Sequence, residues 1–382
     1  MAMHCPHTEQ GSGRQVCSHL LGGLDDNWTT EQFRHYRRFT GHSLNYVLTC
    51  PECREYPLSE LSWVCDPCFV EIAHGSRLGT SGRPQVAETD SGLKLQQVDS
   101  LPPEANLLQV VPFEKGWAAL TETNELILLD SGRRRAFPLA RWELPLYEEL
   151  TLVAREPYVA IASTFGTRGV VVDTATGQVS MSLERAPSPA CRFPLGFTRD
   201  GLLVHGPQLS DPASGAPVKT LHNPEDFHQS SLSPSPDQGW LAMNGWVWHP
   251  MGEVRLLNLN EDRPSRALCR RDGLCDAPLV WLGPNRLGVW GLGELDVMLL
   301  PGLRVFDLET QQELSPILGP EGPFAFDQYL FCHTTEDGFS VWDIETGQRV
   351  YLHPQVHPLA YHPAEKLFLV QTPQGLTLNR LQ

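Results

Sequence analysis

A repeating pattern between residues 93 and 382 limits the possible folds more than any other feature of this sequence. Each unit has a short alternating apolar run that ends in Asp or Asn, then a turn and a second apolar run. The residues that end the first runs are Asp130, Asp173, Asn258, Asp307, Asp343 and Asn379. Neighbouring markers are 36 to 49 residues apart, and a less regular unit at residues 202–221 fits the one gap of 85. A period of about 40–50 residues with four short strands per unit predicts a seven-bladed β-propeller.

The two ends of this region indicate how the ring of blades closes. The last unit, residues 358–382, stops after its third strand, whereas residues 92–101 form a spare strand ahead of the first complete unit. An unpaired strand edge invites aggregation, so we expect the spare strand to pair with residues 376–381 and close the propeller. Two β-sandwiches are the alternative arrangement of many short strands, but sandwiches rarely carry a marker that recurs at this period.

Parts of the repeat resemble a known family. Residues 338–350 resemble the third strand and exit turn of a WD-repeat or quinoprotein-like propeller blade, and residues 357–381 resemble its opening strands. Residues 233–250 have a similar pattern, in which a strand is followed by a Pro-Asp turn and a second strand. The resemblance covers roughly residues 93–382 and implies a fold rather than a function. No regular Gly-His pair precedes each Trp-Asp, so we expect most blades to lack the buried His-Asp network of typical WD repeats.

The first 75 residues contain four close pairs of possible metal ligands. They are Cys5 with His7, Cys17 with His19, Cys50 with Cys53, and Cys65 with Cys68. Structural zinc takes four nitrogen or sulfur ligands, and one Cys-x-x-Cys turn supplies two of them. Two such turns separated by eleven residues are a strong signal. Each Cys-x-His pair can add two more ligands, because alternate residues of an extended segment face the same side. The sequence therefore predicts two structural zinc ions.

The eight ligands can be shared between the two ions in two ways. Each Cys-x-His pair can join one Cys-x-x-Cys pair, which gives two sites of three cysteines and one histidine. Alternatively, the two Cys-x-x-Cys pairs form an all-cysteine site and the N-terminal pairs form the other. We favour the first arrangement, because three thiolates carry less negative charge than four and because it ties residues 1–19 to the module. Residues 25–39, between the ligand pairs, are predicted to form a helix.

Two zinc-finger families resemble this module only in part. Residues 5–7 and 63–68 look like parts of the ubiquitin-protease type zinc finger, which has further Cys and His where this chain has only His74. Cross-braced RING fingers place their second and third ligand pairs close together, whereas about thirty residues intervene here. Activity on ubiquitin therefore does not transfer to this chain. Because protein ligands would fill every position at each ion, the expected role of zinc is structural.

These features together predict the organisation of the chain. We expect a mainly β protein with a zinc-binding α+β module at residues 1–75, a linker at 76–92 and the β-propeller at 93–382. The linker is rich in Gly, Ser, Thr and Pro, which is the composition of connecting segments. Four isolated cysteines in the propeller are expected to pack as small apolar residues: Cys191, Cys269, Cys275 and Cys332.

Composition and motifs exclude several functions and suggest a compartment. The chain has 45 acidic against 29 basic residues, a net charge of −16, which argues against a general grip on nucleic-acid phosphates. The sequence contains no run of 18 apolar residues, which is the length that a membrane-spanning helix needs. The common phosphate-loop, dinucleotide, nucleophile-elbow and metalloprotease motifs are missing. The start lacks a secretory pattern, so we expect a cytoplasmic protein, and scarce Lys beside abundant Arg is typical of a bacterial genome rich in GC.

The leading hypothesis is a non-catalytic interaction protein. In it the propeller binds a protein partner, and the zinc module adds a second contact or docks on the propeller. One alternative is an acidic inhibitor that neutralises a basic partner, as an immunity protein neutralises a toxin. Another is an enzyme whose site lies in the central channel, which requires titratable groups that converge at one channel end.

Overall fold

The computed structural model describes residues 86–382 apart from short gaps, together with the backbone of three short strands nearer the N-terminus. The gaps are residues 102–105, 115, 131–132, 143, 145–148, 188–190, 238, 249–250, 262, 273–274 and 293–299. The three strands form one sheet, in which β1 (Arg14–Cys17) pairs parallel with β2 (Val47–Leu48) and antiparallel with β3 (Leu61–Val64). The helix predicted at residues 25–39 lies outside the described residues.

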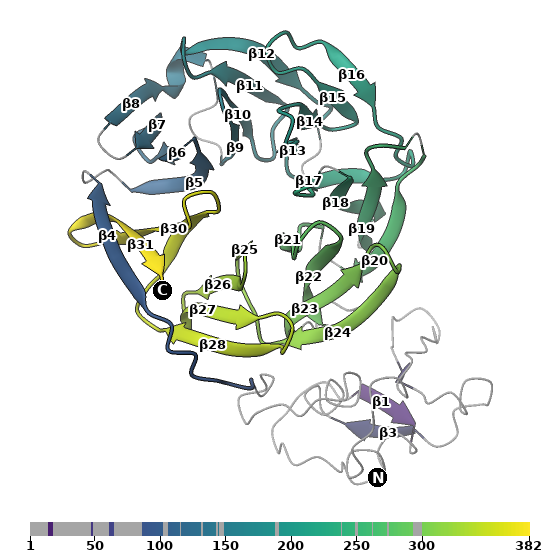
Figure 1. The fold of residues 1–382 in the computed structure, drawn as a ribbon. Helices are drawn as coiled ribbons and strands as arrows, with labels where there is room; N and C mark the ends of the chain where they lie inside the picture. Colours follow the sequence, from purple (N-terminus) through teal and green to yellow (C-terminus); the bar gives the residue numbers. More distant parts are fainter. Residues whose placement is uncertain are drawn as a thin grey trace. The chain divides into compact units, whose positions relative to one another are not determined.

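Seven four-stranded antiparallel sheets surround a common centre, so the prediction of a seven-bladed β-propeller is confirmed (Figure 1). Blade 1 consists of β5 (Leu107–Phe113), β6 (Gly116–Thr121), β7 (Glu125–Asp130) and β8 (Arg133–Pro138). Blade 2 consists of β9 (Leu150–Arg155), β10 (Tyr158–Ser163), β11 (Arg168–Asp173) and β12 (Gln178–Glu184). Blade 3 consists of β13 (Leu195–Phe197), β14 (Leu203–His205), β15 (Gln208–Ser210) and β16 (Pro217–Thr220). Blade 4 consists of β17 (His228–Pro234), β18 (Trp240–Trp248), β19 (Met251–Asn258) and β20 (Arg266–Asp272). Blade 5 consists of β21 (Leu279–Trp281), β22 (Arg286–Leu292), β23 (Leu300–Asp307) and β24 (Gln312–Leu318). Blade 6 consists of β25 (Phe324–Phe326), β26 (Leu330–Thr334), β27 (Gly338–Asp343) and β28 (Gln348–His353). Blade 7 consists of β29 (Pro358–His362), β30 (Leu367–Thr372), β31 (Gly375–Leu381) and β4 (Leu95–Leu101).

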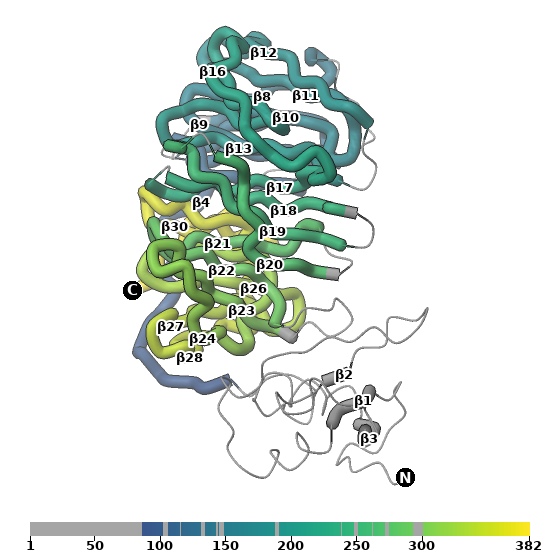
Figure 2. Tube along the Cα trace, turned by 90° about the vertical axis from the view of Figure 1, so that its right-hand side faces the viewer, coloured from purple at the N-terminus to yellow at the C-terminus, as the bar shows by residue number. Residues whose placement is uncertain are grey.

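The first strand of each blade lies nearest the centre, and the last lies at the rim (Figure 1). In the view turned by 90°, the four strands of blade 4 lie side by side from β17 to β20 (Figure 2). A single turn of 3-10 helix, Leu139–Trp142, follows blade 1. No helix in the described part of the chain has the length and apolar character needed to cross a membrane.

The ring closes as the sequence predicted. Strand β4, from the N-terminal side of the propeller, pairs antiparallel with β31, so that Leu101 lies opposite Leu376 and Leu95 opposite Leu381. Lys94 and Gln382 extend this ladder, since each donates its backbone N–H to the carbonyl of the other at 2.8 and 2.9 Å. The closing strand therefore protects the edge that the incomplete last unit would otherwise expose.

The marker residues of the repeat act mainly as turn caps. Asp173, Asp307 and Asp343 each end the third strand of a blade, and each Oδ1 accepts a backbone N–H two residues later at 2.8–2.9 Å. Asn258 makes the same bond to the N–H of Asn260. Asn379 differs, because its amide donates to the Thr377 hydroxyl inside β31 and caps no turn. The repeat thus reflects short-range turn chemistry, in which Asp and Asn side chains replace backbone acceptors.

Alternate residues of the middle strands pack on opposite sides of a blade. In β6, Trp117 and Ala119 pack against blade 7, whereas Ala118 and Leu120 pack against blade 2. The whole strand is therefore buried, because both faces of a propeller blade contact a neighbouring blade. In blade 6, the indole N–H of Trp342 donates to Ser340 at 3.0 Å, so a serine holds the tryptophan of this Trp-Asp pair.

The end of the predicted linker lies along the rim of blade 6. Glu88 pairs in parallel with Arg349 of β28, and their side chains form an ion pair. Two backbone hydrogen bonds, from Thr89 to Arg349 and from Arg349 to Ala87, continue this contact at 3.0 and 2.9 Å. Residues 87–91 therefore cover part of the outer edge of β28, and residues 76–85 lie outside the described part of the chain.

Candidate binding site at the channel mouth

A pocket of about 640 Å³ lies where the first strands of blades 1 to 4 begin. Its apolar lining includes Leu108, Leu120, Leu150, Leu152, Leu195 and Leu232. Its polar lining includes Gln109, Thr121, Thr151, Ser230 and Ser231, and its described charged residues are Glu149 and Arg192. We call this the mouth pocket. Its size falls within the range of known ligand pockets, which are apolar with a few polar groups.

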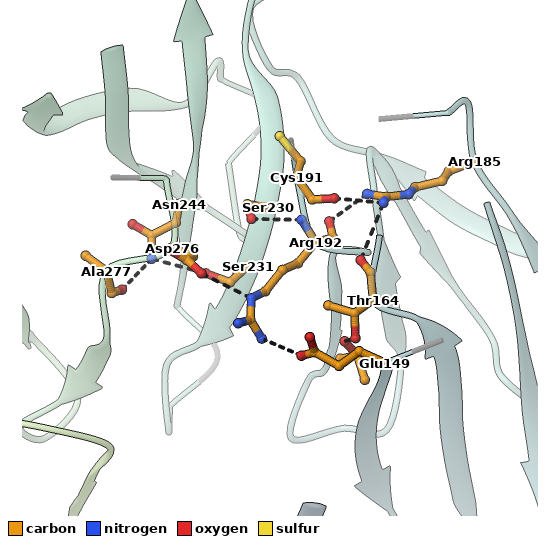
Figure 3. A network of polar contacts seen from close by, with 11 residues as sticks. Glu149, Thr164, Arg185, Cys191, Arg192, Ser230, Ser231, Asn244, Asp276 and Ala277 are labelled. Carbon is orange, nitrogen blue, oxygen red and sulfur yellow. Dashed lines mark hydrogen bonds and ion pairs between the residues drawn. The ribbon is translucent and has the colours of Figure 1, made fainter. Parts of the chain in front are cut away.

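One arginine connects three blades at the mouth pocket (Figure 3). Arg192 precedes β13, and its Nε lies 3.1 Å from a carboxylate oxygen of Asp276, in the segment before β21. Its Nη1 lies 3.6 Å from a carboxylate oxygen of Glu149, which directly precedes β9. All three residues lie one to three positions ahead of a first strand, and the ring brings them together although they are far apart in the sequence.

A second arginine holds the loops that carry this group. Arg185 donates from Nε to the carbonyl of Gly166 at 2.8 Å and from Nη1 to that of Arg192 at 2.6 Å. Its Nη2 donates to the carbonyls of Cys191 at 2.8 Å and Thr164 at 3.5 Å (Figure 3). Burial lowers the pKa of Arg185 below its usual value. The guanidinium therefore fixes the loop after β10 against the segment that positions Arg192.

Polar side chains near the mouth pocket tie neighbouring blades together. Gln109 of blade 1 accepts the backbone N–H of Leu152 in blade 2 at 2.8 Å. The buried Asn244 of blade 4 donates to Ser231 at 3.1 Å and to the carbonyl of Ala277, ahead of blade 5, at 2.7 Å. These bonds satisfy buried polar groups and hold neighbouring blades together beside the mouth pocket.

Exposed apolar side chains stand beside the mouth pocket. Leu108, in its lining, is 65% exposed, and Phe165, in the loop after β10, is 45% exposed. The Arg192 guanidinium lies 5.9 Å from the centre of the Phe165 ring. The other large hydrophobic residues exposed in the described part of the chain lie on last strands at the rim: Val98, Val179, Val218 and Leu352. The mouth pocket is therefore where exposed apolar groups and an arginine meet.

The predicted zinc ligands lie outside what the structure describes. Cys5, His7, His19, Cys50, Cys53, Cys65 and Cys68 are beyond the described residues, and only the backbone of Cys17 is described, in β1. The structure therefore leaves the two zinc sites and their pairing as predictions. Within the described residues, no three side chains of His, Cys, Asp or Glu gather closely enough to hold a metal ion.

The four scattered cysteines form no disulfide, and Cys191, Cys269 and Cys332 are buried, as expected for small packing residues. Burial raises the pKa of Cys269 and Cys332. Burial, and then the nearby Asp276, raise the pKa of the half-buried Cys275 to about 11. These thiols stay protonated at neutral pH, which suits packing rather than nucleophilic attack.

Sequence reasoning did not single out Glu149, Arg192 or Asp276. Each lies in a segment between two blades, and none belongs to a motif. An alignment of the seven units would have placed all three within three residues of the start of a first strand, which was the one available signal.

The chain matches no known protein-family model, and no curated protein matches it significantly. The propeller architecture is therefore established by the structure and by the internal repeat.

Proposed function

We propose that this chain is a non-catalytic interaction protein whose propeller binds a protein partner at the mouth pocket. The observation that carries the proposal is that Leu108 and Arg192 line one cavity and that the exposed Phe165 lies beside Arg192. Aromatic residues and arginine dominate the residues that contribute most to protein–protein affinity, and such residues cluster in pockets. A rigid ring that ends in such a pocket is suited to hold one partner segment.

The lining of the mouth pocket supports binding more than catalysis. Its described residues include one carboxylate, that of Glu149, and neither histidine nor cysteine. General acid–base or nucleophilic catalysis needs a nucleophile or a pair of titratable groups within hydrogen-bond reach of a substrate. Arg192 pairs with two carboxylates, so it holds three blades together, and its side chain, 42% exposed, also contributes to the surface of the pocket.

The experiment compares two matched double variants as bait in extracts of the source organism. Leu108→Ser with Phe165→Ser changes the mouth pocket, and Val98→Ser with Val218→Ser changes comparable exposed side chains at the rim. We expect the rim variant to retain the partner that the unaltered protein captures, and the mouth variant to lose at least nine-tenths of it. Equal capture by both variants would refute a docking site at the mouth pocket.

We further propose that residues 1–75 bind two structural zinc ions through the eight Cys and His residues named above. The spacing of the ligand pairs supports this part of the proposal. Metal analysis of the purified chain should find about two zinc ions per chain, and Cys50→Ser should reduce this number. Purified protein without zinc would contradict the assignment.

An inhibitor of a basic partner is the second candidate, and the excess of 45 acidic over 29 basic residues favours it. Such a complex should form rapidly at low salt, and its association should slow steeply as salt screens the charges. Association that does not change with salt would favour the scaffold instead.

A further inference from the structure

We propose that the mouth pocket recognises a cationic side chain, arginine or lysine, presented by a basic segment of the partner. This inference rests on the proposed function and specifies the chemistry of the same site. It predicts which partner segments enter the pocket and which are excluded.

One exposed carboxylate at the mouth pocket is placed to receive a cation. Arg192 faces two carboxylates, those of Glu149 and Asp276. The half-buried guanidinium of Arg185 beside them is bound to backbone carbonyls. The Glu149 side chain is 60% exposed, and its contact with Arg192, at 3.6 Å, is longer than a hydrogen bond. No described residue donates a hydrogen bond to this carboxylate. Glu149 therefore retains the capacity to accept hydrogen bonds from an incoming ammonium or guanidinium group.

The same charges disfavour an anion. A carboxylate or phosphate that approached Arg192 would have to approach Glu149 and Asp276 as well, and like charges at an interface are repelled. The guanidinium is also already bound through Nε to Asp276, so the two-point contact that makes arginine a strong anion receptor is partly used.

The apolar walls fit the rest of a cationic side chain. The lining includes Leu108, which is exposed, and Leu152 and Leu195, which are buried. Lysine and arginine bury their aliphatic stems on apolar surface while the charged end stays at a polar group. A cavity of about 640 Å³ admits one such side chain together with part of its backbone. The net charge of −16 would also attract a basic segment over a longer range.

The test measures peptide binding to the full-length chain by fluorescence anisotropy. Four labelled peptides share the sequence Gly-Leu-X-Leu-Gly, in which X is arginine, lysine, citrulline or glutamate. Citrulline matches arginine in shape and has no charge, so it isolates the contribution of the positive charge. We expect the arginine and lysine peptides to bind at least threefold more tightly than the citrulline peptide, with the glutamate peptide weakest.

Two variants assign the effect to one carboxylate. Glu149→Gln should remove the preference for arginine over citrulline. Glu345→Gln is the matched control, because Glu345 is also an exposed carboxylate, 70% accessible, that pairs with an arginine, and it lies in the turn after β27. The control should keep the full preference.

Several results would overturn the inference. They are equal binding of the arginine and citrulline peptides, tighter binding of the glutamate peptide, no binding of either cationic peptide at millimolar concentration, and a preference that survives Glu149→Gln. If the mouth double variant still loses its partner in such a case, the proposed docking site stands and only the cation preference fails.

Discussion

Replacing Arg185 by methionine tests how the mouth pocket is held together. The change removes the guanidinium but keeps an unbranched stem against Phe193, whose ring centre lies 5.0 Å from the guanidinium carbon. Arg185 donates three hydrogen bonds of 2.6–2.8 Å and one of 3.5 Å to backbone carbonyls. A bond from a charged donor contributes about 1.5–3 kcal/mol, and partial exposure reduces this to about 1 kcal/mol each. We therefore expect the free energy of unfolding to fall by about 2–4 kcal/mol.

Urea unfolding followed by tryptophan fluorescence measures this loss. The control is Arg263→Met, which removes an 81% exposed side chain whose ion pair with Glu261 is 3.3 Å long. That exposed pair should contribute less than about 1 kcal/mol, so the control should unfold almost as the unaltered protein does. A loss below about 1 kcal/mol for Arg185→Met would show that water replaces the guanidinium at these carbonyls and would refute the reasoning.

Three further predictions follow from other parts of the propeller. Gly245→Ala should prevent stable folding, because a Cβ there would lie 2.3 Å from the carbonyl oxygen of His228. The control Gly347→Ala places its Cβ in open space at φ +68°, so it should lower the free energy of unfolding by only about 1 kcal/mol in the same urea assay. The raised pKa of Cys275, about 11 against 9.0, should leave roughly one hundredth of the usual thiolate at pH 8, so mass spectrometry should find slow alkylation of the native chain. Because the unfolded chain loses this proton near pH 9 and the native state near 11, stability should also fall between these values. Deleting residues 1–101 should cause aggregation in light scattering, whereas deleting residues 1–85 should not, because only the longer deletion removes the strand that pairs with β31.

The fold could be predicted from the sequence because its signals act over short distances. Asp173 and Asp343 cap turns through bonds to residues two positions away, and Gly177 and Gly347 take the positive φ that those turns need. Such local preferences recur in each unit, so their period indicates the number of blades. The last unit lacks its fourth strand, and residues 92–101 form a strand that belongs to no complete unit, so the two were expected to pair. In the structure β4 pairs with β31, as expected.

The candidate site could not be predicted in the same way, because its residues come from different blades. Arg192 and Asp276 are 84 residues apart in the sequence, and their contact depends on how the intervening blades rotate around the ring. Glu149, Arg192 and Asp276 are also three different residue types that lie one to three positions ahead of a first strand, so no repeated residue marks them. The sequence by itself determined a closed ring of seven blades, since local turn chemistry and strand alternation recur in it. Only the tertiary structure decided which side chains meet at the channel mouth, because that meeting is a long-range contact that no local preference encodes.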